Sequence, residues 1–189
     1  MAAALSSGAG KRSPMADMID VTGRAGESAG TLRFGSFAAP CALGRAGILG
    51  PKREGDGGTP AGTFPLRELR YRADRIAAPP VTHLPLYITT RTDGWCDAPD
   101  DPAYNRLVKL PASAETLWRE DRLYDLVVVI GYNDRPVMPG AGSAIFLHVA
   151  FEQKGRLMPT AGCVALRASD LLRVLQGCSP ATQIRIHLV

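Results

Sequence analysis

The sequence predicts a mainly β domain, a barrel or sandwich, with two or three short helices. The observations behind this prediction are several apolar runs of strand length, frequent Gly and Pro between them, and few segments with helical periodicity. A chain of 189 residues suits one domain with a single hydrophobic core. Its contents of 46% hydrophobic and 21% charged residues are those of an ordinary folded protein.

The first part of the chain differs in composition from the rest. Residues 1–30 are small, polar and rich in glycine, which predicts a flexible lead that buries little apolar surface. We therefore expect the folded domain to span residues 31–189. It opens with Thr31–Phe37, which alternates as a strand does, and a long glycine-rich loop follows over residues 44–62.

Further apolar runs predict the remaining strands and helices in order. The strand candidates that follow the loop are Leu84–Thr90, Asp125–Tyr132, Ser143–Ala150 and Gln183–Val189. A helix is predicted over Ala112–Glu120, after Pro111. A second helix is predicted over Asp170–Gln176, with Ser169 as its N-cap and Gly177 at its end.

Composition also argues against several classes of protein. The net charge of +4 is modest, and the arginines are scattered with few aromatic residues among them, which does not favour nucleic-acid binding. No apolar run is long enough to span a membrane. The four cysteines have no C-x-x-C spacing and no paired histidines nearby, so we expect neither a zinc site nor any other bound metal. One disulfide between them remains open.

The strongest chemical signal lies between residues 143 and 172. His148 ends an apolar strand, a loop follows, and Cys163 stands after a glycine in Thr160-Ala161-Gly162-Cys163. A thiol attacks as a thiolate, so it needs a base beside it, and a returning chain would bring His148 to that place. Spacing alone leaves two interpretations open: a catalytic pair, or a buried cysteine and a core histidine.

These segments resemble the YkuD-type L,D-transpeptidase catalytic domain, whose signature joins an upstream histidine to a Ser/Thr-x-Gly-Cys motif. IFLH and PTAGCVAL stand at these places here, and KREGDGGTPAGTF is similar to the glycine-rich loop of the family. GWCDAPDDPAYN and YDLVVVIGYND also fit. The resemblance covers most of the chain from about Phe34 onward, and it implies a YkuD-like β-barrel or sandwich.

The resemblance implies a reaction on the stem peptides of peptidoglycan, with no cofactor. Cys163 is then the nucleophile, His148 the base that later acts as an acid, and the amides of Gly162 and Cys163 the oxyanion hole. The thiol attacks the carbonyl of the third stem residue, a diaminopimelate, and releases the terminal D-alanine. Thr160 shapes the pocket, and an amine of a second stem peptide resolves the thioester.

Two positions depart from the pattern of the family. Ala161 stands where many members have histidine, and Ala165 where they have an arginine that suits a carboxylate. Arg167 is a candidate replacement for this arginine. Ala161, Tyr132 and Asn133 complete the set of residues that we expect to contact substrate, the last two because strand ends open into clefts. His83 and His187 are expected to be structural or exposed.

Three functions remain in competition on sequence alone. The first is an L,D-transpeptidase, the second an L,D-carboxypeptidase in which water replaces the acceptor amine, and the third a catalytically silent module that binds peptidoglycan. The substrate implies the periplasm or cell envelope, although no secretory signal peptide is visible in the sequence.

Overall fold

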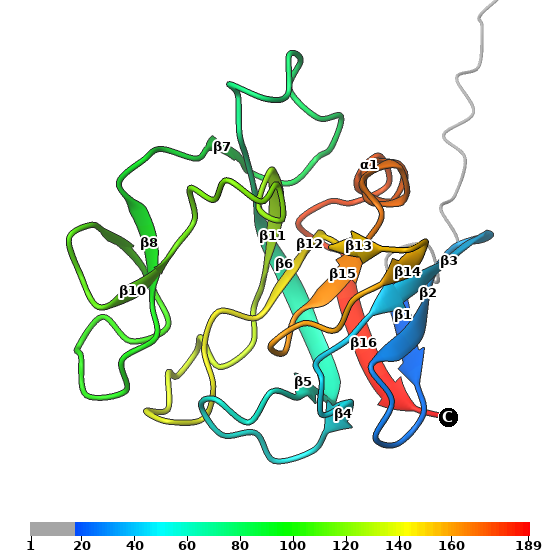
Figure 1. Cartoon of the computed structure of the whole chain (residues 1–189), viewed down its shortest axis with the longest axis horizontal. Coiled ribbons are helices and arrows are strands. Elements are labelled where there is room, and N and C mark those ends of the chain that lie inside the picture. The colour runs from blue at the N-terminus through cyan, green and yellow to red at the C-terminus, as the bar shows by residue number, and fades with distance from the viewer. Residues whose placement is uncertain (1–17) are drawn as a thin grey trace, which may run out of the picture.

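A computed structural model describes residues 18–189, and its centre is a closed β-barrel. Eight strands pair in the order β11-β12-β15-β3-β2-β1-β16-β6, and β6 pairs again with β11 to close the ring; β7 adds to the outside of β6 (Figure 1). The barrel strands are β1 (Met18–Gly23), β2 (Ala29–Phe34), β3 (Phe37–Ala42), β6 (Gly62–Tyr71), β11 (Leu126–Ile130), β12 (Phe146–Val149), β15 (Val164–Leu166) and β16 (Gln183–Leu188). The predicted mainly β fold is confirmed.

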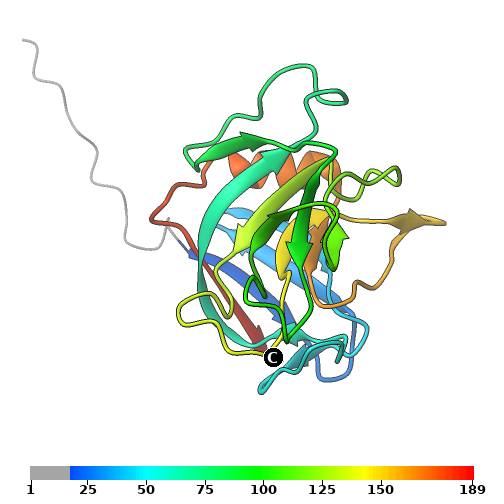
Figure 2. The same ribbon diagram turned by 90° about the vertical axis from the view of Figure 1, so that its left-hand side faces the viewer.

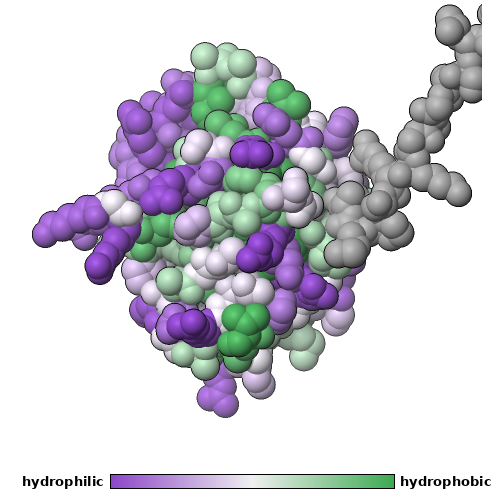
Figure 3. Space-filling model, turned by 90° about the vertical axis from the view of Figure 1, so that its right-hand side faces the viewer, coloured by the Kyte–Doolittle hydropathy of each residue, from purple (hydrophilic) through white to green (hydrophobic). Residues whose placement is uncertain are grey.

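A second layer covers one side of the barrel. It is a three-stranded sheet in the order β10-β8-β9, which lies away from α1 and β1–β3 (Figures 1 and 2). The remaining elements are β4 (Ile48–Leu49), β5 (Thr59–Pro60), β7 (Leu86–Ile88), β8 (Asp93–Cys96), β9 (Leu107–Lys109), β10 (Ala114–Thr116), β13 (Glu152–Gln153), β14 (Arg156–Leu157) and α1 (Ala168–Leu175). The opposite face of the molecule carries mixed hydrophilic and hydrophobic residues (Figure 3).

The continuous apolar run of β11 is explained by these two layers. All five of its residues are buried. Leu126, Val128 and Ile130 face the main core inside the barrel, and Val127 and Val129 face a second apolar cluster under the β8 sheet. A strand that is covered on both faces loses the alternation of polar and apolar residues. The same division places Leu147 of β12 in the main core and Phe146 in the second cluster.

The structure corrects several predictions about individual elements. The predicted boundary at residue 30 is too late, because β1 and the start of β2 lie before it; residues 1–17 of the expected lead lie outside the described residues. The helix predicted over Ala112–Glu120 is wrong. Its central residues form β10, which pairs with β8, and Leu117 is buried. Tertiary pairing here outweighs a weak helical preference.

One helix is present in residues 18–189, where two or three were predicted. It begins at Ala168, its N-cap is Arg167, and no side chain caps it, so the predicted N-cap Ser169 lies inside the first turn. Leu171, Val174 and Leu175 of α1 pack into the main core. The strand predicted over Leu84–Thr90 is shorter, and its residues in β7 are exposed rather than buried.

Candidate active site

Two neighbouring parallel strands bring Cys163 and His148 together. In the pairing of β12 with β15, Leu147 is opposite Val164 and His148 is opposite Ala165, and Cys163 directly precedes β15. The Cys163 Sγ donates a hydrogen bond to the Ala144 carbonyl at 3.3 Å and accepts one from the Phe146 amide at 3.4 Å. The thiol is therefore held beside the entry to the strand that carries the imidazole.

Both side chains line one cleft of about 520 Å³. Thr160, Ala161 and Gly162 line it as well, as the sequence predicts. The rest of the lining combines apolar residues, among them Leu123, Ile145, Phe151 and Met158, with the charged residues Arg45, Lys52, Glu54, Asp97, Glu115 and Arg119. The cleft lining thus combines apolar side chains with charges of both signs, which suits a charged peptide.

Burial dominates the protonation of the thiol. It raises the pKa of Cys163 to about 12, while the Phe146 amide and the Lys52 ammonium act in the opposite direction. A neighbouring imidazole is expected to depress the pKa of a thiol, but His148 is not among the groups that lower the pKa of Cys163, and burial prevails. At neutral pH the resting thiol is therefore protonated. A thiol in this state becomes a nucleophile only where a base takes its proton.

His148 is neutral and presents a fixed tautomer. Burial lowers its pKa to about 4, and Arg119 lowers it further, whereas the carbonyls of Val149 and Leu123 raise it. The ring Nδ1 lies 2.8 Å from the Val149 carbonyl. Because a carbonyl only accepts hydrogen bonds, Nδ1 carries the hydrogen, and the lone pair is on Nε2. An imidazole in this form is able to accept a proton.

An aromatic and a carboxyl side chain support the imidazole. The Tyr124 ring packs edge-on against His148 at 5.2 Å and against Phe146 at 5.8 Å. The Tyr124 hydroxyl donates to Glu115 at 2.7 Å, and burial raises the pKa of both groups. These contacts orient the ring of His148. The sequence gives no chemical role to Glu115, and although Tyr124 opens the segment YDLVVVIGYND that fits the family, nothing in that segment singles out the tyrosine as a neighbour of His148.

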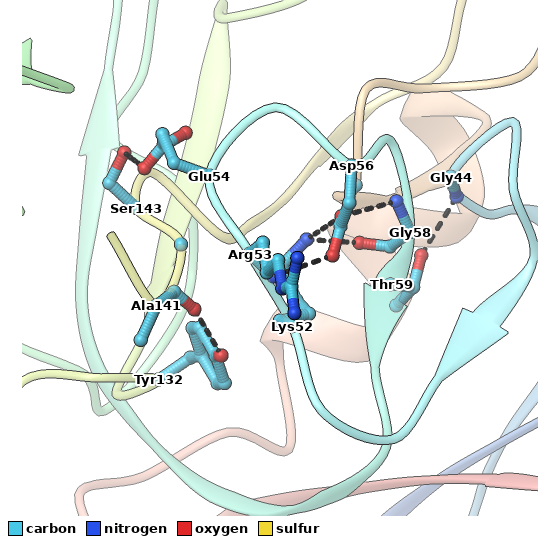
Figure 4. Close-up of polar contacts among 12 residues, drawn as sticks. Gly44, Lys52, Arg53, Glu54, Asp56, Gly58, Thr59, Tyr132, Ala141 and Ser143 are labelled. Carbon is cyan, nitrogen blue, oxygen red and sulfur yellow. Dashed lines mark hydrogen bonds and ion pairs between the residues drawn. The ribbon is translucent and has the colours of Figure 1, made fainter. Parts of the chain in front are cut away.

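Two threonines hold the backbone of Cys163. The Thr160 Oγ1 donates to the Cys163 carbonyl at 2.7 Å, and the Thr59 Oγ1 lies 3.4 Å from the same oxygen. Thr59 also accepts the Gly44 amide at 2.8 Å (Figure 4). Thr59 of the glycine-rich loop thus joins this loop to the segment that carries Cys163, a contact that the sequence alone does not predict.

Gly162 is required by close packing. Its φ is +149°, and a Cβ at this position would lie 2.8 Å from the Gly58 carbonyl oxygen. Its amide donates to Thr160 Oγ1 at 3.1 Å, so it is not the free oxyanion donor that the resemblance implies. The Cys163 amide has no acceptor within residues 18–189, which leaves it available for a developing oxyanion.

The glycine-rich loop also places an ammonium group near the thiol. The Lys52 Nζ lies 2.5 Å from Asp56 Oδ1 and donates to the Gly58 carbonyl at 2.7 Å (Figure 4). Asp56 is held in turn by the amides of Arg53 and Gly58, and with Lys52 these bonds outweigh burial and lower its pKa. The Lys52 charge is thereby largely neutralised at a fixed point of the cleft.

Three residues expected to contact substrate lie elsewhere. The Tyr132 hydroxyl donates to the Ala141 carbonyl at 2.6 Å (Figure 4), and Asn133 bonds Met138 and the Gly142 carbonyl. Both therefore shape the loop between β11 and β12. Arg167 binds Glu152 at 3.2 Å and the Gly155 carbonyl at 3.3 Å. It holds the β13–β14 hairpin, which projects from the domain (Figure 2).

The other histidines and cysteines take no part in the cleft. His187 lies 3.0 Å from Asp20, and His83 is exposed. All four cysteines are free and buried, so the disulfide left open by the sequence does not form here. Residues 18–189 contain no cluster of three or more His, Cys, Asp or Glu side chains that would hold a metal ion. The described part of the chain also has no helix that is long and apolar enough to cross a membrane.

The barrel presents a cysteine and a histidine to one charged cleft, which is the pairing that nucleophilic catalysis by cysteine requires. The comparison with known families agrees with this description. The L,D-transpeptidase catalytic domain of the YkuD family matches residues 27–186, and the chain belongs to this family. The family acts on peptidoglycan. Among curated proteins and among solved structures, nothing matches the chain.

Proposed function

We propose that the protein is a peptidoglycan L,D-transpeptidase that cross-links stem peptides through a thioester on Cys163. The observation that carries this proposal is the shared cleft of Cys163 and His148, at the positions where the family signature has its cysteine and histidine. A module that only binds the polymer has no need for a thiol and an unprotonated imidazole together.

The chemistry starts from two neutral groups. As the Cys163 sulfur attacks the carbonyl carbon of the third stem residue, the thiol proton moves to Nε2 of His148. The Cys163 amide donates to the oxygen that becomes negative. The bond to D-alanine then breaks, its nitrogen takes the proton from the imidazolium, and the thioester remains.

Resolution of the thioester needs an amine. The nitrogen of a second stem peptide attacks the thioester carbonyl, its proton goes to His148, and the sulfur leaves and recovers a proton from the imidazolium. The side chains of Asp97 and Glu115 line the cleft and are suited to an incoming ammonium group. Because the polymer lies outside the cytoplasmic membrane, we place the reaction in the periplasm or cell envelope.

The test is incubation of wild type, Cys163→Ala and Cys178→Ala with a purified disaccharide-tetrapeptide, followed by mass spectrometry. Cys178→Ala is the matched control because its thiol is also buried but lies in the main core. We expect covalent dimers and free D-alanine with wild type and Cys178→Ala, and neither with Cys163→Ala.

Other outcomes separate the competing functions. Monomeric tripeptide without dimers would indicate a carboxypeptidase that uses water. Unchanged substrate with all three proteins, together with retained binding to peptidoglycan, would indicate the silent module and would reject the proposal. Equal turnover by Cys163→Ala and wild type would reject Cys163 as the nucleophile.

A further inference from the structure

The charged side chains of the cleft differ in whether they already have a partner. Lys52 is bound to Asp56 at 2.5 Å. Arg119 binds Asp121 at 2.5 Å and lies 3.5 Å from Glu115. Arg45, the third cation of the lining, makes no ion pair and no side-chain hydrogen bond with any residue between 18 and 189. An exposed guanidinium of the cleft is thus free to bind a ligand.

The backbone of Arg45 has a fixed position relative to the nucleophile. Its amide donates to the Thr160 carbonyl at 2.9 Å, and the Thr160 amide donates to the Leu43 carbonyl at 2.9 Å. Thr160 in turn donates through Oγ1 to the Cys163 carbonyl at 2.7 Å. Arg45 is therefore tied to the segment that carries the Cys163 sulfur, and both residues line the same cleft.

The glycine-rich loop supports the side chain of Arg45. Gly57 has a φ of +72°, and a Cβ on it would lie 2.8 Å from the Arg45 Cζ and 2.9 Å from its Nε. The guanidinium thus rests against the bare backbone of Gly57, while the residue as a whole stays exposed. This packing restricts the side chain, and a restricted guanidinium loses less entropy when it binds a ligand.

The other arginine suggested by the sequence does not reach the cleft. Arg167 is bound to Glu152 and Gly155 on the β13–β14 hairpin, and position 165 holds an alanine buried in the sheet. A guanidinium matches a carboxylate through two parallel hydrogen bonds and keeps its charge at every physiological pH. We propose that Arg45 is a specificity-determining residue that binds a carboxylate of the donor stem peptide.

This inference rests on the proposed function, because the donor is a stem tetrapeptide. Two carboxylates of that peptide flank the bond that breaks, one on the terminal D-alanine and one on the side chain of the diaminopimelate. Three ligands distinguish them: the natural disaccharide-tetrapeptide, the same molecule with a C-terminal carboxamide, and an analogue with lysine in place of diaminopimelate.

Binding is measured by calorimetry in the Cys163→Ala background, which prevents turnover, with Arg45→Gln, Arg45→Lys and Arg33→Gln added singly. Arg33 is an exposed arginine of β2 outside the cleft lining and serves as the matched control. We expect Arg45→Gln to weaken binding of the natural ligand about ten- to a hundredfold. Arg45→Lys should recover part of this loss, and Arg33→Gln should change affinity less than twofold.

When Arg45 is present, only one of the two modified ligands should bind as weakly as the natural ligand binds to Arg45→Gln. For that modified ligand, Arg45→Gln and the protein with Arg45 should have the same affinity. If Arg45→Gln loses affinity equally for all three ligands, the inference is overturned, because the substitution then has a general structural effect. Unchanged affinity in Arg45→Gln would overturn it as well. Wild-type turnover is measured separately: if turnover is absent but binding depends on Arg45, the proposed function fails and the inference stands.

Discussion

Cys163 and Cys178 lie in regions of opposite character although their thiols are alike in protonation. Burial raises the pKa of each to about 12. Cys178 is fully buried in the main core, where its Sγ donates to the Val174 carbonyl at 3.3 Å. Cys163 is 6% exposed and opens into the cleft that it shares with His148. The two thiols therefore differ in their neighbours and their access to the cleft rather than in their acidity, and this difference is what assigns the proposed nucleophile to Cys163.

The two regions also differ in how the backbone is held. Around Cys178 the contacts are apolar packing between α1 and the barrel. Around Cys163, hydroxyls of Thr59 and Thr160 bond the main chain, and a glycine with positive φ allows the loop to approach. Polar bonds in a buried setting define one geometry, because leaving any of them unmade costs free energy. A reactive site needs a single fixed geometry more than an apolar core does.

The largest expected effect concerns His148, which shares the cleft with Cys163, whereas Cys178 lies in the main core. His148→Gln should lower kcat for release of D-alanine about 10²- to 10⁴-fold, the usual contribution of a general base. The neutral Cys163 thiol then has no acceptor for its proton. A coupled assay for free D-alanine measures the rate. A loss smaller than tenfold would contradict the role of His148, and circular dichroism of the variant verifies that the fold is retained.

Alkylation by iodoacetamide compares the two thiols directly. The rate at Cys163 should increase roughly tenfold for each pH unit between pH 7 and 10, because the thiolate fraction does so when the pKa is about 12. Cys178 should react only after unfolding in denaturant. Peptide mass spectrometry assigns the sites. Rapid labelling of Cys163 at mildly acidic pH would instead mean that the thiol is already ionised.

The stability of the region around His148 should depend on pH. Its folded pKa of about 4 is below the ordinary value of 6.5, so between these values the unfolded chain binds more protons than the folded one. The contribution of neutral His148 to the free energy of unfolding is therefore complete above pH 6.5 and is lost as the pH falls towards 4. The loss amounts to about 2 kcal/mol between pH 7 and pH 5. Urea unfolding of wild type and His148→Gln at several pH values measures this loss. If the free energy of unfolding depends on pH equally in both proteins, the prediction is contradicted.

The polar bonds behind Cys163 are tested by Thr59→Val. Valine keeps the shape but leaves the Gly44 amide without its acceptor, which should reduce the free energy of unfolding by about 1–3 kcal/mol. Thr63→Val is the control, because Thr63 is exposed, and its effect should stay within about 0.5 kcal/mol. Urea denaturation gives both values. Equal effects of the two substitutions would show that the buried bond contributes little.

The smallest effect is expected outside the cleft. Tyr132→Phe removes the hydrogen bond to the Ala141 carbonyl and should cost about 1 kcal/mol of stability. Because Tyr132 does not line the cleft, KM and kcat should each remain within twofold of wild type. A large rise in KM would restore the role in substrate binding that its place at a strand end predicts.

The sequence by itself determined the fold class, most strands and the central pair of the site. Apolar runs bounded by Gly and Pro specify strands through local backbone preference. Cys163 and His148 belong to motifs that can be recognised in the amino-acid sequence. The strand at β11 was predicted within two residues at each end for this reason. The helix predicted at Ala112–Glu120 failed because its residues pair with β8, a partner that local preference does not reveal.

The tertiary structure alone decided which polar groups meet. Thr59 reaches Cys163 across 104 positions of the chain, and Tyr124 and Arg45 come to the cleft although the sequence gives neither of them a role in the site. It also decided that Arg167, Tyr132 and Asn133 face away from the cleft, and that burial, rather than the imidazole, sets the pKa of the thiol. Contacts over such sequence distances depend on how the barrel closes, and so does desolvation; neither is encoded in any local pattern of residues.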